Sequence, residues 1–305
     1  MRYVDIERLQ LPDKWETRAE TALDELRTEI QRAEDDARAA DKNTEEIAAA
    51  RKDAISKGID DREKIWKELA SGLAKLSNDK CWYSESINAT ADMDVDHFRP
   101  KKRVKEEPDH EGYWWKAFDW RNYRYSAQWP NRYRNDKTSG TRGGKGDQFP
   151  LCSNSFRARM EEDDCDSEEP ALLDPTDPND WKLLTFRPNG EPTPSAEPNT
   201  KEYVRAEESI SVYHLHCRKL VKKRQSLASQ VERLILEMEK HFLKIKDSTS
   251  RQTYTAHQKE LLRLIHWDHE YSAAALAYAR AQVYTRKYGR QVERHWLKDI
   301  LNSPI

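Results

Sequence analysis

The chain has 305 residues, of which 36% are hydrophobic and 35% are charged, and its formal net charge is −2. An apolar fraction this low is lean for one compact core, so the composition predicts an elongated, multi-lobed protein. No apolar run approaches the roughly 18 residues of a membrane-spanning helix. The near-zero charge excludes a general nucleic-acid coat, so any nucleic-acid surface must be local.

The first residues, MRYVDIERLQLPDKW, lack the apolar core of a signal peptide. The four cysteines form no CxxC pair, which favours reduced thiols over a disulfide framework. We therefore expect a cytoplasmic protein with no membrane partner.

Residues 1–78 are predicted to form a helical lobe. From Trp15 onward, apolar residues recur at helical spacing among charges, the pattern of an amphipathic helix. A second helix is expected over residues 43–57. A third is expected to begin at Asp60 or Asp61, with a stripe of Ile65, Leu69, Leu73 and Leu76.

Residues 79–155 hold five of the ten tryptophans and no sustained helical period, which predicts a small, loop-rich domain. We expect Trp114, Trp115 and Trp120 in its core. Residues 202–305 return to helical periodicity and form the predicted C-terminal helical lobe.

Residues 156–201 connect these two parts. Their acidic stretch, EEDDCDSEE at 161–169, is expected to be a solvated loop because like charges cannot pack together. LLTFRPNGEPTP predicts two short strands around an Asn189-Gly190 turn. The predicted fold class is therefore mainly α with a small α+β insert between helical N- and C-terminal lobes.

Three polar segments follow one another in the loop-rich domain: DVDHFRPK at 94–101, DWRNYRYS at 119–126 and WPNRYRNDK at 129–137. They place His97, Asn122 and Asn131 in the order His, Asn, Asn. At these residues the sequence resembles the HNH (ββα-metal) endonucleases, in which a hairpin and a helix hold one divalent cation.

The resemblance extends over residues 62–230, through six segments in family order. These segments are KCWYSE, DVDHFRPKKR, YWWKAFDWRNYRYS, NRYRNDK…GGKGDQFPL, LLDPTDPNDWKLLTFRPNGEP and SISVYHLHCRKLVKKR. Together they resemble the PtuB family, the HNH effectors of Septu and related retron anti-phage systems. This implies a ββα-metal nuclease unit in residues 79–155, and a complex with a PtuA-like ATPase.

Phosphodiester hydrolysis needs a deprotonated water and a positive charge near the phosphate. By resemblance, His97 takes the general-base position, Asp96 and Asn131 take the metal-ligand positions, and Asn122 tethers the hairpin loop. A hard oxygen donor set of this kind favours one Mg²⁺ or Mn²⁺ ion. We expect Asp94 to be structural. The alternative is that Asp96 caps a turn and both Asn residues merely occupy loops.

A local excess of positive charge supports a phosphate partner. From His97 to Asp147 there are thirteen Lys and Arg against seven Asp and Glu. A basic loop of this kind is suited to a phosphate backbone, although each cation could also be an ordinary solvated side chain. The candidate nucleic-acid-binding residues are Arg99, Lys101, Lys102, Arg103, Arg132, Arg134, Lys137, Arg142 and Lys145.

The sequence departs from the family that it resembles at a zinc knuckle, which many members of that family carry as two CxxC pairs. Only Cys81 remains here, because Ser84, Ala127 and Pro130 occupy the other three positions. One thiolate cannot hold a tetrahedral zinc, so no structural zinc is expected and packing must replace it. His214, His216 and Cys217 lack a second ligand cluster and are interpreted as structural.

Two further interpretations stay open. The chain could be a non-catalytic docking module that keeps the HNH shape, or its substrate could be RNA rather than the favoured DNA, since such a site does not exclude a 2′-hydroxyl. The sequence has no GxxxxGK[ST] phosphate-binding loop, so any control by ATP must come from the partner.

Overall fold

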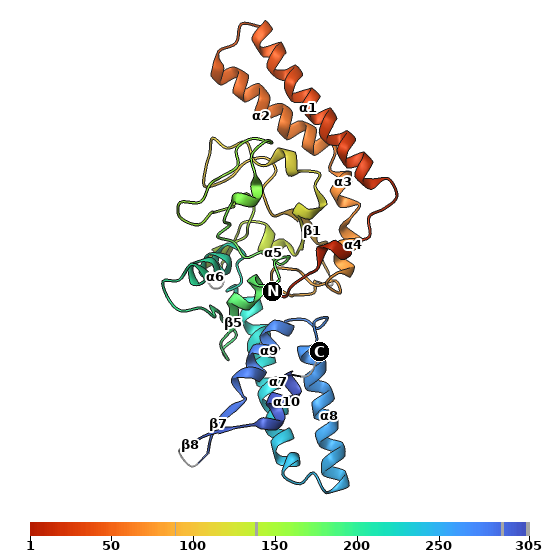
Figure 1. Ribbon diagram of the computed structural model, residues 1–305, viewed down its shortest axis with the longest axis vertical. Helices are drawn as coiled ribbons and strands as arrows, with labels where there is room; N and C mark the ends of the chain where they lie inside the picture. The colour runs from red at the N-terminus through yellow and green to blue at the C-terminus, as the bar shows by residue number, and fades with distance from the viewer. Residues whose placement is uncertain (89, 138–139, 288–289, 303–305) are drawn as a thin grey trace.

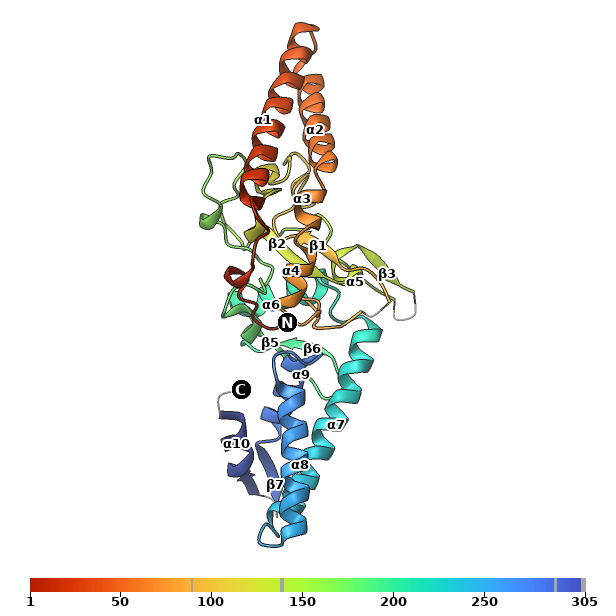
Figure 2. The same cartoon turned by 90° about the vertical axis from the view of Figure 1, so that its right-hand side faces the viewer.

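The computed structural model describes residues 1–88, 90–137, 140–287 and 290–302, and it is elongated (Figure 1). A helical hairpin projects at one end, a loop-rich middle follows, and a second helical lobe forms the other end, as the side view in Figure 2 also shows. The described chain is mainly helical with small antiparallel sheets, which confirms the predicted mainly α class. None of the described helices is long and apolar enough to span a membrane.

The projecting hairpin consists of α1 (Trp15–Ala39) and α2 (Thr44–Asp61). α1 buries Leu26 and Ile30 on the face that meets α2. Asn43 begins α2 with a capping box, in which its side chain accepts from the backbone of Glu46 and the Glu46 carboxylate accepts in return. The predicted second helix is confirmed, with an end four residues later.

The predicted start of the third helix, at Asp60 or Asp61, is wrong. Ile55 and Ile59 continue the buried stripe of α2, so α2 runs through Asp60 and Asp61 instead of ending before them. Two short helices follow, α3 (Lys64–Lys67) and α4 (Ala70–Lys75). α3 carries Trp66, which is 7% exposed.

The loop-rich middle is organised by an antiparallel pair, β1 (Asp94–His97) and β2 (Tyr123–Ser126). The single-turn helix α5 (Gln128–Asn131) follows β2 at once, so the order along the chain is strand, strand, helix. A second hairpin, β3 (Arg134–Asp136) and β4 (Thr141–Gly143), comes next. The residue after this hairpin, Gly144, donates its backbone N–H to the carbonyl of Val212 at 2.8 Å.

The remaining elements lead into the C-terminal lobe. The Asn-Gly hairpin is confirmed by β5 (Leu184–Phe186) and β6 (Pro192–Pro194), with Gly190 at a positive φ of 88°. α6 (Lys201–Val212) packs with the loop-rich middle through Ala206 and Val212. The lobe contains α7 (Arg218–Phe242), α8 (Ser248–Ile265), α9 (Ser272–Ala281) and α10 (His295–Asn302), with the hairpin β7 (Tyr284–Lys287) and β8 (Arg290–Glu293).

Buried apolar side chains form two clusters. The first extends from Met1 to Leu215 and combines the N-terminal helices with the loop-rich middle. The second contains Phe186 and side chains from Cys217 to Leu301. The three tryptophans that the sequence predicts in the core, Trp114, Trp115 and Trp120, all belong to the first cluster.

The acidic stretch at 161–169 is not simply a solvated loop. Glu168 is 6% exposed, and its carboxylate accepts from Arg99 Nε at 2.7 Å and from the Tyr113 hydroxyl at 2.5 Å. Glu161 pairs with Arg27 of α1. The expectation failed because these carboxylates face cations and hydroxyls from distant parts of the chain, which the local run of like charges does not reveal.

Candidate active site

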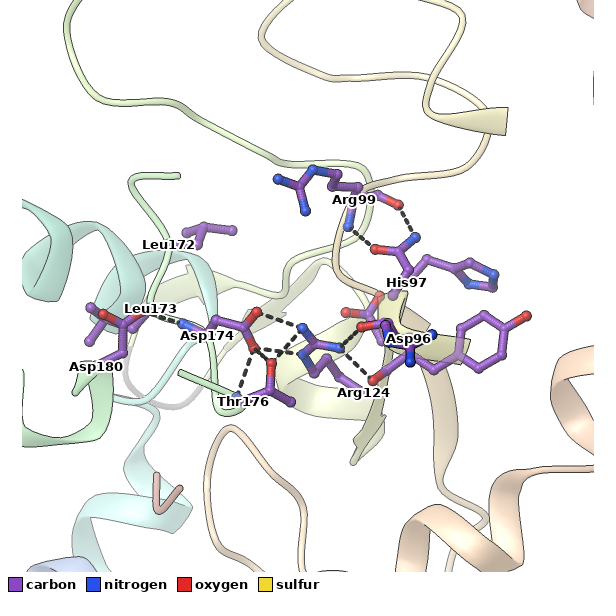
Figure 3. Close-up of polar contacts among 12 residues, drawn as sticks. Asp96, His97, Arg99, Arg124, Leu172, Leu173, Asp174, Thr176 and Asp180 are labelled. Atoms are coloured by element: carbon purple, nitrogen blue, oxygen red, sulfur yellow. Dashed lines mark hydrogen bonds and ion pairs between the residues drawn. The ribbon is translucent and has the colours of Figure 1, made fainter. Parts of the chain in front are cut away.

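Asp96 and His97 end β1, and their side chains lie on opposite faces of the strand. In the register, Asp96 is opposite Arg124 and His97 is opposite Tyr123. Figure 3 shows the His97 ring extending away from the ion pair that Arg124 forms with Asp174. The two neighbours therefore meet different surroundings.

His97 is 3% exposed and has a defined tautomer. Its Nε2 lies 2.9 Å from the carbonyl oxygen of Ala117, and a carbonyl can only accept, so Nε2 carries the proton. Nδ1 therefore holds the lone pair, which accepts from Lys101 Nζ at 3.3 Å. Burial, and then Lys101, lowers the pKa of His97 well below its usual value, so the ring is neutral at neutral pH.

Trp66 and Lys101 cover the imidazole. The rings of Trp66 and His97 meet edge to face, with centroids 5.2 Å apart. Lys101 Nζ lies 5.0 Å from the centre of the Trp66 ring. Burial lowers the pKa of Lys101 to about 8, so its ammonium can lose a proton more easily than a solvated lysine. α3, from the N-terminal helices, thus forms part of this site.

Asn122 joins the two ends of the segment between the strands. Its Oδ1 accepts from the backbone N–H of Arg99 at 2.8 Å. Its Nδ2 donates to the carbonyl of Arg99 at 3.0 Å and to that of Lys116 at 3.2 Å. These bonds hold the loop that presents the Ala117 carbonyl to His97.

Asp96 is 6% exposed and is already satisfied by two neighbours. One carboxylate oxygen accepts from the Tyr83 hydroxyl at 2.6 Å, and the ammonium of Lys145 lies 3.4 Å away. The same ammonium donates to the backbone carbonyl of His97 at 2.7 Å. Burial lowers the pKa of Lys145, while the charge of Asp96 acts in the opposite direction.

Asn131, the second predicted metal ligand, lies beside Asp94 rather than Asp96. Its Nδ2 donates to Asp94 Oδ2 at 2.9 Å, and Arg132 Nη2 lies 2.7 Å from the other oxygen of Asp94. Within the described part of the chain, no three His, Cys, Asp or Glu side chains are grouped so that they could hold a metal ion. As arranged here, Asp96 and Asn131 do not fit a shared divalent cation, because Lys145 supplies the positive charge beside Asp96.

A buried ion pair behind the strand was not predicted from the sequence. Arg124 contacts both carboxylate oxygens of Asp174, at 2.7 and 2.5 Å, and Thr176 completes the cluster (Figure 3). Burial alone would raise the pKa of Asp174, but Arg124 lowers it. The sequence signal for this ion pair was weak and lay in the segment LLDPTDPNDW, which carries aspartates in a turn-rich stretch. The cluster fixes β2 against residues 172–180.

The predicted basic surface is smaller than the sequence suggested. Lys145 is buried and Arg99 is engaged by Glu168, so neither presents its charge to solvent. Four other positions are ion-paired or hydrogen-bonded to side chains: Lys102 to Asp60, Arg103 to Asp147, Arg132 to Asp94 and Arg134 to Gln128. Lys137 and Arg142 are exposed on the β3–β4 hairpin.

The positions at which many PtuB-like sequences carry zinc-knuckle cysteines are stabilised here by packing and hydrogen bonds. Cys81 is buried with its Sγ 3.8 Å from Ser126 Oγ, and Ser84 Oγ lies 2.8 Å from Ser86 Oγ. Tyr83 is fully buried and its ring stacks on Tyr213 at 4.0 Å. Among the aromatic residues next to these positions, Trp82 and Tyr83 are buried and Trp129 is half-buried.

No protein-family model matches the chain. The chain is similar to the Septu protein PtuB of Bacillus mycoides, with 31% identity over 194 residues. The match covers 61% of this chain and 60% of that protein, so the chain spans less than two thirds of its relative's length.

Proposed function

We infer from this similarity that the chain belongs to the PtuB family, and we propose that it is the nuclease effector of an anti-phage defence system. In this proposal it is an endonuclease that hydrolyses phosphodiester bonds, with DNA as the favoured substrate. A PtuA-like ATPase is the proposed partner.

The observation that carries the proposal is the orientation of His97. Its Nε2–H is bonded to the Ala117 carbonyl, and Asn122 tethers the loop on which Ala117 lies. A neutral imidazole held in one tautomer, with Nδ1 as the only basic atom, is the arrangement that a general base requires. The strand–strand–helix order around it agrees with a ββα unit.

In the proposed reaction, His97 accepts one proton from the attacking water. Water attacks phosphorus as Nδ1 takes its proton, the bond from phosphorus to the leaving oxygen breaks, and the leaving oxygen takes up a proton from solvent. For water to reach Nδ1, Lys101 must leave that nitrogen, and its ammonium can then neutralise charge on the same phosphate. Because Trp66 also covers the ring, we propose that the partner activates the enzyme by moving α3 or Lys101 away from His97.

The expected Mg²⁺ or Mn²⁺ stays a prediction. Asp96 and Asn131 bond to different neighbours, so no step is assigned to a metal here. If activity is metal-dependent, EDTA should abolish cleavage and either ion should restore it. The fold should be unaffected by EDTA and no stoichiometric zinc should be found, because Asp96 is satisfied by Lys145 and a single knuckle thiol remains.

A second candidate function is favoured by the burial of the site. Asp96 and His97 are only 6% and 3% exposed, and each already has protein hydrogen-bond partners. A permanently closed site of this kind would suit a non-catalytic module that docks onto other proteins of a defence complex.

One experiment separates the two functions. Purified protein, alone and with the ATPase encoded beside it, is incubated with end-labelled DNA and RNA pools, with Mg²⁺, with Mn²⁺ or with EDTA. The proposal predicts internal cleavage of one pool, greater with the partner present. Cleavage of RNA alone would move the substrate to RNA, and no cleavage under any condition would favour the docking module.

A further inference from the structure

A groove of about 890 Å³ lies on the side of α5 away from Asp94. It is bounded by α5, by the first two turns of α7 and by residues 84–88. Three of its lining residues, Ser84, Ala127 and Pro130, are the positions at which the sequence lacks knuckle cysteines. The groove therefore occupies the former knuckle region and is not part of the site around His97.

The groove is basic. Lys219, Lys222 and Lys223 line it and are exposed, and their spacing of three and four residues places them on one face of α7. The acidic lining residue is Glu270, whose carboxylate accepts from the backbone N–H of Ile87 at 3.0 Å. Three ammonium groups against one carboxylate give the groove a net positive charge, which is complementary to a phosphate backbone.

The groove also contains a half-buried indole flanked by cations. Lys219 Nζ lies 5.6 Å and the Arg134 guanidinium 5.8 Å from the Trp129 ring centre. An aromatic ring beside a row of positive charges is the combination that binds unpaired bases, because the base stacks on the ring while the cations follow its phosphates. Paired bases in a duplex are already stacked and cannot reach Trp129.

α5 connects the groove to the candidate active site. Trp129 and Pro130 line the groove, whereas the next residue, Asn131, lines the separate pocket that contains Asp94 and Trp66. A strand seated on Trp129 would therefore need to cross only this single helical turn to reach the pocket lined by Trp66, whose ring covers His97.

We propose that this groove binds single-stranded nucleic acid, with a base on Trp129 and phosphates on Lys219, Lys222 and Lys223. This inference rests on the proposed function in one respect only, which is that the bound strand is the substrate. The nucleic-acid contacts predicted from the sequence lie on residues 99–145 and do not include these lysines. The signal was present in RKLVKKR, where lysines recur at helical spacing.

The test measures binding in EDTA, so that cleavage does not interfere. A short fluorescent single strand and the matching duplex are titrated with full-length protein over a salt series, with fluorescence anisotropy as the readout. The variant K222A/K223A is compared with K244A/K246A, which removes the same charge from exposed lysines beyond the end of α7. W129L is compared with W267L, a tryptophan that is 46% exposed outside the groove.

The groove predicts that K222A/K223A weakens binding of the single strand and reduces the salt slope by roughly 1.4, because each lost phosphate contact on a single strand contributes about 0.7. W129L should weaken binding about tenfold with little change in slope, on the scale of one lost base stack. The two control variants should bind as the wild type does. Circular dichroism and thermal unfolding confirm that each variant is folded.

The inference is overturned if the wild type does not bind the single strand, or if K222A/K223A and its control behave alike. Equal affinity for the duplex with the same dependence on Trp129 also overturns it. Binding that depends on the groove without any cleavage would contradict the proposed function and leave the groove intact. If cleavage depends on His97 but the groove variants bind as the wild type does, the proposed function stands and the groove inference is wrong.

Discussion

Lys145 provides the positive charge next to Asp96 inside the protein. Its side chain is fully buried, 3.4 Å from the carboxylate, and also donates to the backbone of His97. Removing two opposite charges from water is costly, and their attraction offsets that cost only while both are present. The pair is therefore more sensitive to loss of one partner than to loss of both.

The effects of substituting Asp96 and Lys145 on stability should therefore be strongly non-additive. K145M should lower the free energy of unfolding by about 3–5 kcal/mol, because it leaves Asp96 buried and unpaired. D96N/K145M should be less destabilised than K145M alone. Urea denaturation measures both, with K102M as control, since the Lys102–Asp60 pair is partly exposed and should contribute about 1 kcal/mol or less. Strict additivity of D96N and K145M would contradict the account.

The sequence predicted contacts between site residues that are close together in the chain better than contacts between residues that are far apart in it. His97, Asn122 and the intervening loop are connected within 26 residues, and their motif was readable. The partners of Asp96 and Arg124 come from Tyr83, Lys145 and Asp174, which no local pattern relates to β1 or β2. Burial of a lysine in particular contradicts its average behaviour, so composition alone assigned Lys145 to the basic surface.

At the scale of elements, the β5–β6 hairpin fastens the connecting segment to α7. Gly190 has a φ of 88°, and its carbonyl accepts from the buried Arg224 Nε at 2.8 Å. A Cβ at this position would lie 2.1 Å from the carbonyl oxygen of Val221. The turn therefore requires glycine both for its backbone angle and for its close approach to α7.

G190A should consequently destabilise the protein much more than G140A. Gly140 has a similar φ of 73°, but a Cβ there would meet nothing within 4 Å, so G140A carries only the backbone cost, about 1 kcal/mol. Thermal unfolding of the two variants isolates the effect of the contact with α7. Equal midpoints would show that the hairpin can leave α7 without penalty.

Helices and hairpins were predicted correctly where a single local feature of the sequence determines the structure. Asn189-Gly190 marked its hairpin because few residues tolerate the required φ. The boundary near Asp60 failed because Asp60 and Asp61 are good cap residues, yet the stripe of Ile55 and Ile59 extended α2 through them. Packing against α1 outweighed the capping signal.

At the scale of the whole molecule, the two apolar clusters meet through specific polar contacts. The Glu85 carboxylate accepts from the backbone N–H of Ala273 at 3.0 Å, and Lys80 Nζ donates to the carbonyl of His269 at 3.1 Å. These contacts connect the segment of residues 80–85, which bonds to β2 through Trp82, to the start of α9. A partner that binds the C-terminal lobe would therefore act on a body connected to the site.

The far end of α7 provides a surface for such a partner. Leu236 and Leu243 are 43% and 75% exposed and line one shallow pocket together with charged side chains. Exposed apolar side chains gathered in this way are typical of protein interfaces. We predict that L236D/L243D no longer co-purifies with the PtuA-like ATPase and that V204D, which alters a 54% exposed valine on α6, still does. Retention of the ATPase by L236D/L243D would exclude this end of α7 as the interface.

The central claim is that His97 is the general base, and a matched histidine tests it. His110 is also 3% exposed, and its Nε2 likewise lies 2.7 Å from a backbone carbonyl, that of Ala158. Its Nδ1, however, already accepts from the backbone N–H of Gly112 at 2.9 Å, so its lone pair is not available to a water molecule. H97A and H110A therefore remove similar buried rings, of which only one is proposed to act in catalysis.

The decisive measurement is the single-turnover cleavage rate of folded H97A and folded H110A, each with the partner ATPase and the substrate that the wild type cleaves. The account predicts that H97A slows cleavage by roughly 10²-fold or more, the contribution of general-base catalysis, while H110A cleaves at nearly the wild-type rate. A folded H97A that cleaves as fast as the wild type would contradict it.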